Sequence, residues 1–147
     1  MKAFKIPRSV LVLIHTPDLQ FLMLKRAPKA EFDQDFWQSV TGSLDALDES
    51  PLLAAKRELL EETGYRAERY THVTDIHNAL AYCDEVIHFY LAEGLIQAGE
   101  QQLDDNEFVQ VLRVPLSQLM AWIKNGWVSD VKTQLGAFWL QDYLKQS

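Results

Sequence analysis

A chain of 147 residues with 48% hydrophobic and 24% charged side chains has the composition of a globular protein large enough to bury a core. No linker or repeat interrupts it, so we expect a single domain over residues 1–147. The net charge of −7 argues against nucleic-acid polymers and anionic membranes as main partners, although it permits a small anionic ligand held through a metal ion.

The cysteine content and the apolar segments bear on the cellular location. The single cysteine, Cys83, excludes an internal disulfide and suits a reducing compartment. The apolar run at residues 9–14 is too short for a signal-peptide core, and no window approaches the roughly 18 apolar residues of a membrane span. We therefore expect a cytoplasmic protein without a membrane segment.

The N-terminal part is expected to begin with a β-hairpin. Residues 9–15 are β-branched and apolar, as in a buried strand, and residues 20–25 read as a second strand after a turn signal at residues 16–18. This order predicts that the two strands pair with each other. Residues 36–41 resume an extended pattern that ends at Gly42.

The clearest helix follows at residues 50–63. Ser50 fits an N-cap, and Pro51 occupies the first helical position, where a missing N–H costs nothing. Residues 52–62 are rich in Leu, Ala and Glu, which favour helices. Gly64 is expected to end the helix in the left-handed conformation.

The second half of the chain is predicted to contain further strands and two helices. Helices that follow strands without a regular βαβ alternation indicate an α/β protein with a mixed sheet and helices on its faces. The expected elements are an extended region at residues 65–92, a polar loop at 94–106, a half-buried strand at 108–114, a short helix at 117–124, and a final helix capped by Ser129 that reaches about residue 144.

Three carboxylates of the helix at 50–63 share one face. At about 100° per residue, Glu58, Glu61 and Glu62 fall together, and Ala54 and Ala55 leave space beside them one turn earlier. Like charges at these spacings cost a few tenths of a kcal/mol each. The face could be merely solvated, or it could hold a hard cation such as Mg²⁺ or Mn²⁺, which takes oxygen ligands together with substrate phosphates.

The leucines of this helix are expected to lie in the protein core. They fall away from the acidic face on the same helical projection, so they can pack into the core while a ligand approaches the acidic face. The leucines concerned are Leu52, Leu53, Leu59 and Leu60.

These residues resemble the Nudix hydrolase motif, G-x5-E-x7-R-E-U-x-E-E-x-G-U, in which U is a bulky aliphatic residue. The segment RELLEETGY at residues 57–65 fits the second half of this pattern. Between Gly42 and Glu49 there are six residues instead of five, so the upstream acidic position falls on Glu49 or on Asp48. A loop can bulge without rotating a helix face, which favours Glu49 and places the insertion in residues 43–48.

The resemblance implies a Nudix α/β/α sandwich and hydrolysis of a nucleoside diphosphate linked to another group. Glu58 and Glu62 would be the principal ligands of Mg²⁺, with Mn²⁺ as an alternative, and Glu61 would join them directly or through water. Arg57 would orient the glutamates by charge-assisted hydrogen bonds. The implied metal ligands are Gly42, through its carbonyl, and Glu49, Glu58, Glu61 and Glu62; the implied catalytic residues are Arg57, Glu58, Glu61, Glu62 and Glu107.

Segments of the chain resemble two different branches of the family. FWQSVTGS at residues 36–43 resembles dihydroneopterin-triphosphate and dATP pyrophosphohydrolases, whereas FYLAEGL at 89–95 and NGWVSDVKTQLGAFWLQ at 125–141 resemble ADP-ribose pyrophosphatases. In the second branch a late acidic residue can act as general base, which would be Glu107 or, as second choice, Asp105. The resemblance favours ADP-ribose or another nucleotide sugar over a nucleoside or pterin triphosphate, and relatives of this branch are often homodimers.

A Nudix module that binds a nucleotide without cleaving it is the alternative from another class. Such a module would be expected to lack one or more of Arg57, Glu58, Glu61 and Glu62, and all are present. The four histidines of the chain show no metal-ligand spacing along the sequence. We therefore expect His88 to be a half-buried strand residue without a role in catalysis.

Overall fold

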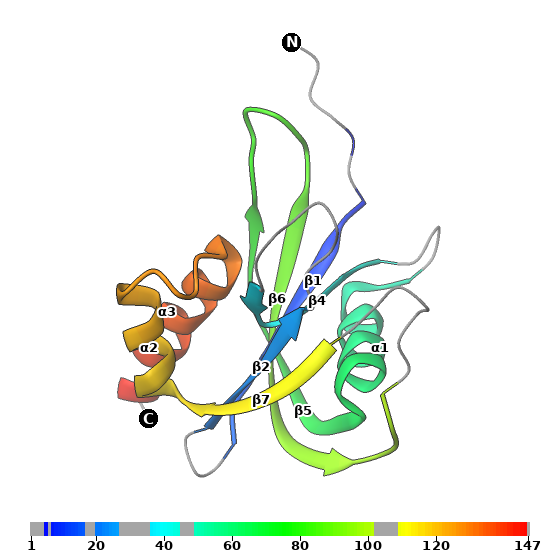
Figure 1. The fold of residues 1–147 in the computed structure, drawn as a ribbon. Coiled ribbons are helices and arrows are strands. Elements are labelled where there is room, and N and C mark those ends of the chain that lie inside the picture. Colours follow the sequence, from blue (N-terminus) through cyan, green and yellow to red (C-terminus); the bar gives the residue numbers. More distant parts are fainter. Residues whose placement is uncertain are drawn as a thin grey trace.

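The structure is a computed structural model that describes residues 5, 7–16, 20–26, 36–44, 49–101 and 109–146. Within these ranges the strands lie between α1 on one side and α2 with α3 on the other (Figure 1). The elements are β1 (Ser9–Ile14), β2 (Gln20–Arg26), β3 (Phe36–Gln38), β4 (Val40–Ser43), α1 (Pro51–Thr63), β5 (Tyr65–His77), β6 (Val86–Gln97), β7 (Val109–Pro115), α2 (Leu116–Lys124) and α3 (Val131–Lys145).

The strands form two sheets, which confirms the expected α/β sandwich. One sheet has the order β4-β1-β6-β5, in which β1 is parallel to β6 and the other neighbours are antiparallel. The other sheet has the order β3-β2-β7 and is antiparallel. None of the helices in the described ranges is long and apolar enough to cross a membrane.

Strand β1 is the centre of the core. It is buried along its whole length because β4 and β6 pair with its two edges and helices cover both faces. Leu11 and Leu13 pack into the cluster that contains residues of α2 and α3, whereas Val10, Val12 and Ile14 pack into the cluster that contains residues of α1. The alternation of a strand thus supplies both halves of the core.

The expected hairpin between β1 and β2 is wrong. Strand β2 pairs with β3 and β7, and it lies in a different sheet from β1. Strand β6 occupies one edge of β1 along its whole length, and β4 occupies the other edge at residues 9–12, where a hairpin partner would otherwise pair. Adjacency in the sequence is a poor guide here because the pairing partners of β1 come from later in the chain.

The extended segment at 36–41 proves to be two strands that belong to different sheets. Strand β3 pairs with β2, and β4 pairs with β1. The chain changes sheets at Ser39, which is fully buried and whose backbone N–H donates to Thr133 Oγ1 at 3.0 Å. This hydrogen bond satisfies the amide that neither sheet uses and connects the crossing point to α3.

Two element boundaries differ from expectation. Strand β6 continues to Gln97, beyond the predicted loop start, because Gly94 adopts a φ of 73° that lets the strand pass through a conformation unfavourable for other residues. The final helix is capped by Asp130 and not by Ser129, since the Asp130 carboxylate accepts the N–H of Thr133 at 3.0 Å.

Strands β5 and β6 form a long antiparallel ribbon that extends beyond the helices (Figure 1). Its register shifts between His72, which pairs with Tyr90, and Thr74, which pairs with Phe89, so that one extra residue, Val73, lies on β5. This β-bulge interrupts the alternation of side chains. As a result, residues three apart on either side of it share a face.

Candidate functional site

Helix α1 carries the acidic face, and its ends are formed as the sequence predicts. The Ser50 hydroxyl accepts the N–H of Leu53 at 3.2 Å, and Gly64 ends the helix with a φ of 77°. These caps fix the register of the carboxylates between them.

The buried face of α1 differs from the prediction. Leu52 and Leu53 are 37% and 56% exposed, whereas Glu58 and Glu62 are each only 9% exposed. Leu59 alone among the four leucines of the helix is buried. The helix therefore turns its alanines and two of its glutamates toward the sheet, and the carboxylates point into the molecule.

Gly42 explains how a carboxylate fits between α1 and the sheet. It lies on β4, and a Cβ atom built at this position would overlap the carboxyl group of Glu58. The glycine thus leaves the space that the Glu58 side chain fills. Burial raises the pKa of Glu58, an effect that the charge and hydrogen bond of Arg57 only partly offset.

Arg57 connects the acidic residues. Its Nε and Nη2 atoms each donate to one carboxylate oxygen of Glu49 at 2.8 Å, and Nη2 also donates to the Ser43 carbonyl at 3.0 Å. Its Nη1 atom donates to Glu58 at 2.9 Å and to Glu61 at 3.2 Å. The hydrogen bond with Glu49 is the main cause that raises the pKa of Arg57, so the guanidinium stays charged.

The structure therefore brings six of the residues selected from the sequence into one region. They are Gly42, Glu49, Arg57, Glu58, Glu61 and Glu62. Three other candidates, Asp48, Asp105 and Glu107, lie outside the described residues, as do residues 45–48, where most of the predicted insertion falls. Their roles stay predictions.

A divalent cation fits this group of residues. The donors are carboxylate oxygens, which hard cations such as Mg²⁺ prefer. Glu58 and Glu62 are nearly buried, and burial penalises the charge of a carboxylate whereas a bound cation would stabilise it. The charge of Arg57 offsets only part of this penalty at Glu58, which leaves the group suited to a further positive charge.

A cavity of about 850 Å³ opens beside the C-terminal end of α1. Thr63, the residue after Glu62, lines this cavity. Gln101 also lines it, and its Nε2 atom donates to the backbone carbonyl of Glu62 at 2.7 Å. Other lining side chains include Tyr65, Gln110 and Arg113. The sequence gives no signal for these residues, because they come from α1, β5, β7 and the segment after β6 and share no local pattern.

Comparison with known proteins identifies the family. The family model of the NUDIX domain matches residues 5–133, which is most of the chain. The chain belongs to the Nudix family. It is 33% identical over 138 residues to the ADP-ribose pyrophosphatase of Bacillus subtilis (strain 168), covering 93% of this chain and 74% of that protein. The Nudix chain is thus a hydrolase that acts on pyrophosphate bonds.

Two further relatives carry different names. The Nudix chain is 30% identical to the methanol dehydrogenase activator of Bacillus methanolicus, covering 92% of this chain and 72% of that protein. It is also 30% identical to the GDP-mannose pyrophosphatase of Escherichia coli (strain K12), covering 75% of this chain and 56% of that protein. The names of the relatives thus differ: two give a nucleotide sugar pyrophosphatase, and one gives an activator of another enzyme.

Solved structures confirm the fold. The crystal structure of an ADP compounds hydrolase superposes with a TM-score of 0.82 at 22% sequence identity, covering 95% of this chain and 73% of that chain. A NUDIX hydrolase from Nitrosomonas europaea gives a TM-score of 0.73 at 18% identity, covering 96% and 90% of the two chains. At these identities the likeness concerns the fold alone.

Proposed function

We propose that this Nudix hydrolase cleaves the diphosphate of a nucleoside diphosphate sugar, with ADP-ribose as the first candidate. The observation that carries the proposal is the group of buried carboxylates on α1, which faces Gly42 and is held by Arg57. Named relatives that act on ADP-ribose and on GDP-mannose support a nucleotide sugar over a triphosphate.

We assign the metal-binding role to Glu58 and Glu62, with Glu61 and the Gly42 carbonyl as further ligands. Mg²⁺ is the expected ion and Mn²⁺ the alternative, since both take oxygen ligands. Such an ion would neutralise the diphosphate and activate a water molecule. Arg57 holds the Glu58 and Glu61 carboxylates in place through its Nη1 atom. The two side chains are therefore already ordered before the ion binds, which lowers the entropic cost of binding.

The proposed reaction consumes one water molecule and needs no further reactant. The water oxygen forms a bond to one phosphorus atom, and the bond between that phosphorus and the bridging oxygen breaks. The products are two phosphate monoesters, a nucleoside monophosphate and a sugar phosphate, and the protons of the water pass to a base and to the solvent. Glu107 is our candidate for the base, with Asp105 second.

The cavity beside α1 is the proposed binding site for the part of the substrate outside the diphosphate. Its volume of about 850 Å³ suits a nucleotide-sized ligand. Tyr65 offers an aromatic ring, Gln97, Gln101 and Gln110 offer amides, and Arg113 offers a positive charge. An aromatic surface with amides around it suits a base and sugar hydroxyls better than an apolar ligand.

The test is hydrolysis of a substrate panel by the purified chain. We expect Mg²⁺-dependent release of phosphate monoesters from ADP-ribose, compared with GDP-mannose, deoxynucleoside triphosphates and dihydroneopterin triphosphate under the same conditions. Glu62→Gln should retain the fold by circular dichroism and lose activity at least about a hundredfold, since the metal contributes several kcal/mol.

Other outcomes of the panel would change the proposal. Preferred cleavage of a triphosphate would replace the nucleotide sugar as substrate while keeping the site. Tight binding of one compound without turnover of any would favour the non-catalytic module. Unchanged activity of Glu62→Gln would contradict the metal role of α1.

A further inference from the structure

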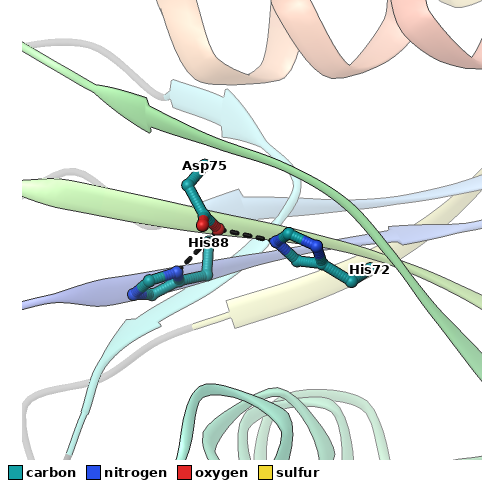
Figure 2. Close-up of side chains that lie close together, drawn as sticks. All are labelled: His72, Asp75 and His88. Atoms are coloured by element: carbon teal, nitrogen blue, oxygen red, sulfur yellow. Dashed lines mark hydrogen bonds and ion pairs between the residues drawn. The ribbon is translucent and has the colours of Figure 1, made fainter.

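Two histidines and an aspartate meet on the β5–β6 ribbon, outside the acidic site. Asp75 of β5 lies directly opposite His88 of β6 in the strand register, and His72 lies opposite Tyr90. Residues 72 and 75 would point to opposite faces of a regular strand, but the bulge at Val73 takes up one residue and brings them to the same face. Figure 2 shows both imidazole rings directed toward the Asp75 carboxylate.

The three side chains converge on one oxygen atom. His72 Nε2 and His88 Nδ1 each lie 2.7 Å from Oδ1 of Asp75 (Figure 2). One potential ligand atom from each residue lies within 4.8 Å of the other two. These three side chains are therefore close enough together to hold one metal ion.

We propose that His72, Asp75 and His88 bind a divalent cation of the zinc class, such as Zn²⁺, Co²⁺ or Ni²⁺. Two imidazole nitrogens and one carboxylate oxygen form a donor set that these ions prefer and that Mg²⁺ does not. The site takes its remaining ligands from water, because the side chains of His72 and Asp75 are 49% and 46% exposed. It is independent of the proposed hydrolysis.

The distances between the three side chains suit an ion after small adjustments. Metal bonds of about 2.0–2.2 Å place tetrahedral ligand atoms roughly 3.3 Å apart, so each 2.7 Å contact must open by about half an ångström. His88 is held in the sheet with 10% of its side chain exposed and serves as the fixed ligand. The exposed His72 and Asp75 can adjust by rotation about their side-chain bonds.

The environment of His88 limits the affinity of this site for a metal ion. Metal binding at His88 Nδ1 moves the imidazole proton to Nε2, a buried atom without a hydrogen-bond partner in the described part of the chain. Metal-bound histidines usually donate from this second nitrogen to a carboxylate or carbonyl, and the lack of such an acceptor weakens the site. We therefore expect an affinity below that of structural zinc sites with four protein ligands.

This site is separate from the carboxylates of α1. In the sheet register, Gly42 pairs with Val10 and Val10 pairs with His88, so two strand spacings separate Gly42 from His88. Adjacent strands lie about 4.8 Å apart, which gives a separation of roughly 10 Å between their backbones. The two groups differ in ligand type as well, since one offers oxygens and the other mainly nitrogens.

The experiment is titration of the full chain, freed of metal with a chelator, with Zn²⁺ by calorimetry and with Co²⁺ by visible absorption. We expect one equivalent to bind at this site in the presence of excess Mg²⁺. His72→Ala and Asp75→Asn should each weaken binding at least about tenfold. His77→Ala is the matched control, because His77 is an exposed histidine of the same strand that does not belong to the group, and it should bind as the wild type does.

Two results would overturn the proposal. One is equal Zn²⁺ affinity in the wild type, His72→Ala and Asp75→Asn. The other is binding that Glu62→Gln abolishes and His72→Ala does not, which would assign the ion to the carboxylates of α1. Because His72 and Asp75 are substantially exposed, both substitutions should leave the fold intact, and circular dichroism checks this. His88→Gln provides a third variant, and retained affinity in this variant would also count against the site.

Discussion

Glu49 and Arg57 form a two-pronged ion pair in which both carboxylate oxygens accept from the guanidinium at 2.8 Å. The same guanidinium reaches Glu58 and Glu61 with its remaining nitrogen. Glu49 thus acts on the carboxylates of α1 through Arg57, eight residues further along the chain. This geometry favours a positioning role for Glu49 over direct metal binding.

A double-mutant cycle distinguishes the two roles of Glu49. If Glu49 positions Arg57, Glu49→Gln and Arg57→Lys should each lower kcat about 10- to 100-fold, and the double variant should be no worse than the more severe single variant. The activation constant for Mg²⁺ should change little in Glu49→Gln. A further loss of Mg²⁺ affinity when Glu49→Gln is added to Arg57→Lys would instead show that Glu49 binds the metal.

Gly42→Ala should disrupt the proposed active site. The added methyl group would overlap the Glu58 carboxylate, so we expect at least a tenfold fall in kcat and weaker activation by Mg²⁺. Gly136→Ala is the control, since its methyl group would overlap Leu13 in the core and should cost about 1–3 kcal/mol of stability without altering activation by Mg²⁺. Full activity of Gly42→Ala would contradict the close packing of Glu58 on β4.

Glu58→Gln should stabilise the metal-free protein while it removes activity. Burial raises the pKa of Glu58, so the folded state favours the protonated carboxyl, and ionisation of this group costs stability as the pH rises through the folded-state pKa. Gln mimics the neutral form. We expect the free energy of unfolding, measured in urea with a chelator present, to be higher for the variant than for the wild type at pH 7. This difference should vanish below pH 4.5, the ordinary pKa of a glutamate in the unfolded chain.

A loss of stability in Glu58→Gln would contradict this prediction. A variant that is less stable than the wild type at pH 7 without metal would mean that the hydrogen bond with Arg57 at 2.9 Å outweighs the cost of burial. Hydrolysis should fall at least about a hundredfold in either case, because the variant would lack the charge of a proposed metal ligand.

Thr133→Val should loosen the connection between α3 and the point where the chain changes sheets. Thr133 is fully buried, and its hydroxyl accepts from Ser39 N–H at 3.0 Å while it donates to Asp130 at 2.7 Å. Val has the same shape and leaves the Ser39 amide unsatisfied, at a cost of about 1–3 kcal/mol in the free energy of unfolding. Thr133→Ser keeps the hydroxyl and should lose less; equal losses in the two variants would refute the role of the hydrogen bond.

Asp75→Asn should lower stability in a pH-dependent way when no metal is bound. The hydrogen bond from His72 is the main cause that holds the pKa of Asp75 below its usual range, with a smaller contribution from His88. A depressed pKa stabilises the fold above the unfolded-state value, 3.8 here, and this contribution is lost as the pH falls through the folded-state pKa.

The size of the Asp75 effect should be modest. The carboxylate is half exposed, so we expect roughly 0.5–1 kcal/mol at pH 6 in urea unfolding, shrinking toward zero below pH 3.8. If the difference in the free energy of unfolding between wild type and variant stays constant down to the lowest pH, the charge of Asp75 does not contribute to stability.

Local patterns predict the acidic helix well. Its caps at Ser50 and Gly64 and the grouping of Glu58 with Glu62 depend only on the geometry of one helix, which is the same wherever the helix packs. The predicted burial of the leucines is correct for Leu59 and wrong for Leu52 and Leu53, although leucines usually mark the buried face of a helix. Here the absence of a side chain at Gly42 lets a carboxylate approach the sheet, and this information lies outside the helix.

Non-local pairing cannot be predicted in the same way. Strand β1 pairs with β4 and β6, which follow much later in the chain. The turn signal after β1 suggests a hairpin with the next strand, but that hairpin does not form. The group of His72, Asp75 and His88 escapes prediction for a related reason. Its members meet only when β5 and β6 pair in one register with a bulge, and no spacing along the chain indicates that register.

The bulge at Val73 also determines how this group would be recognised in other chains. Removing the extra residue would restore a regular strand in which the first histidine and the aspartate stand two residues apart and still share a face. Related proteins can therefore encode the same arrangement as His-x-x-Asp with a bulge or as His-x-Asp without one. A gap at this position in a sequence alignment would therefore leave the arrangement of the histidine and the aspartate unchanged.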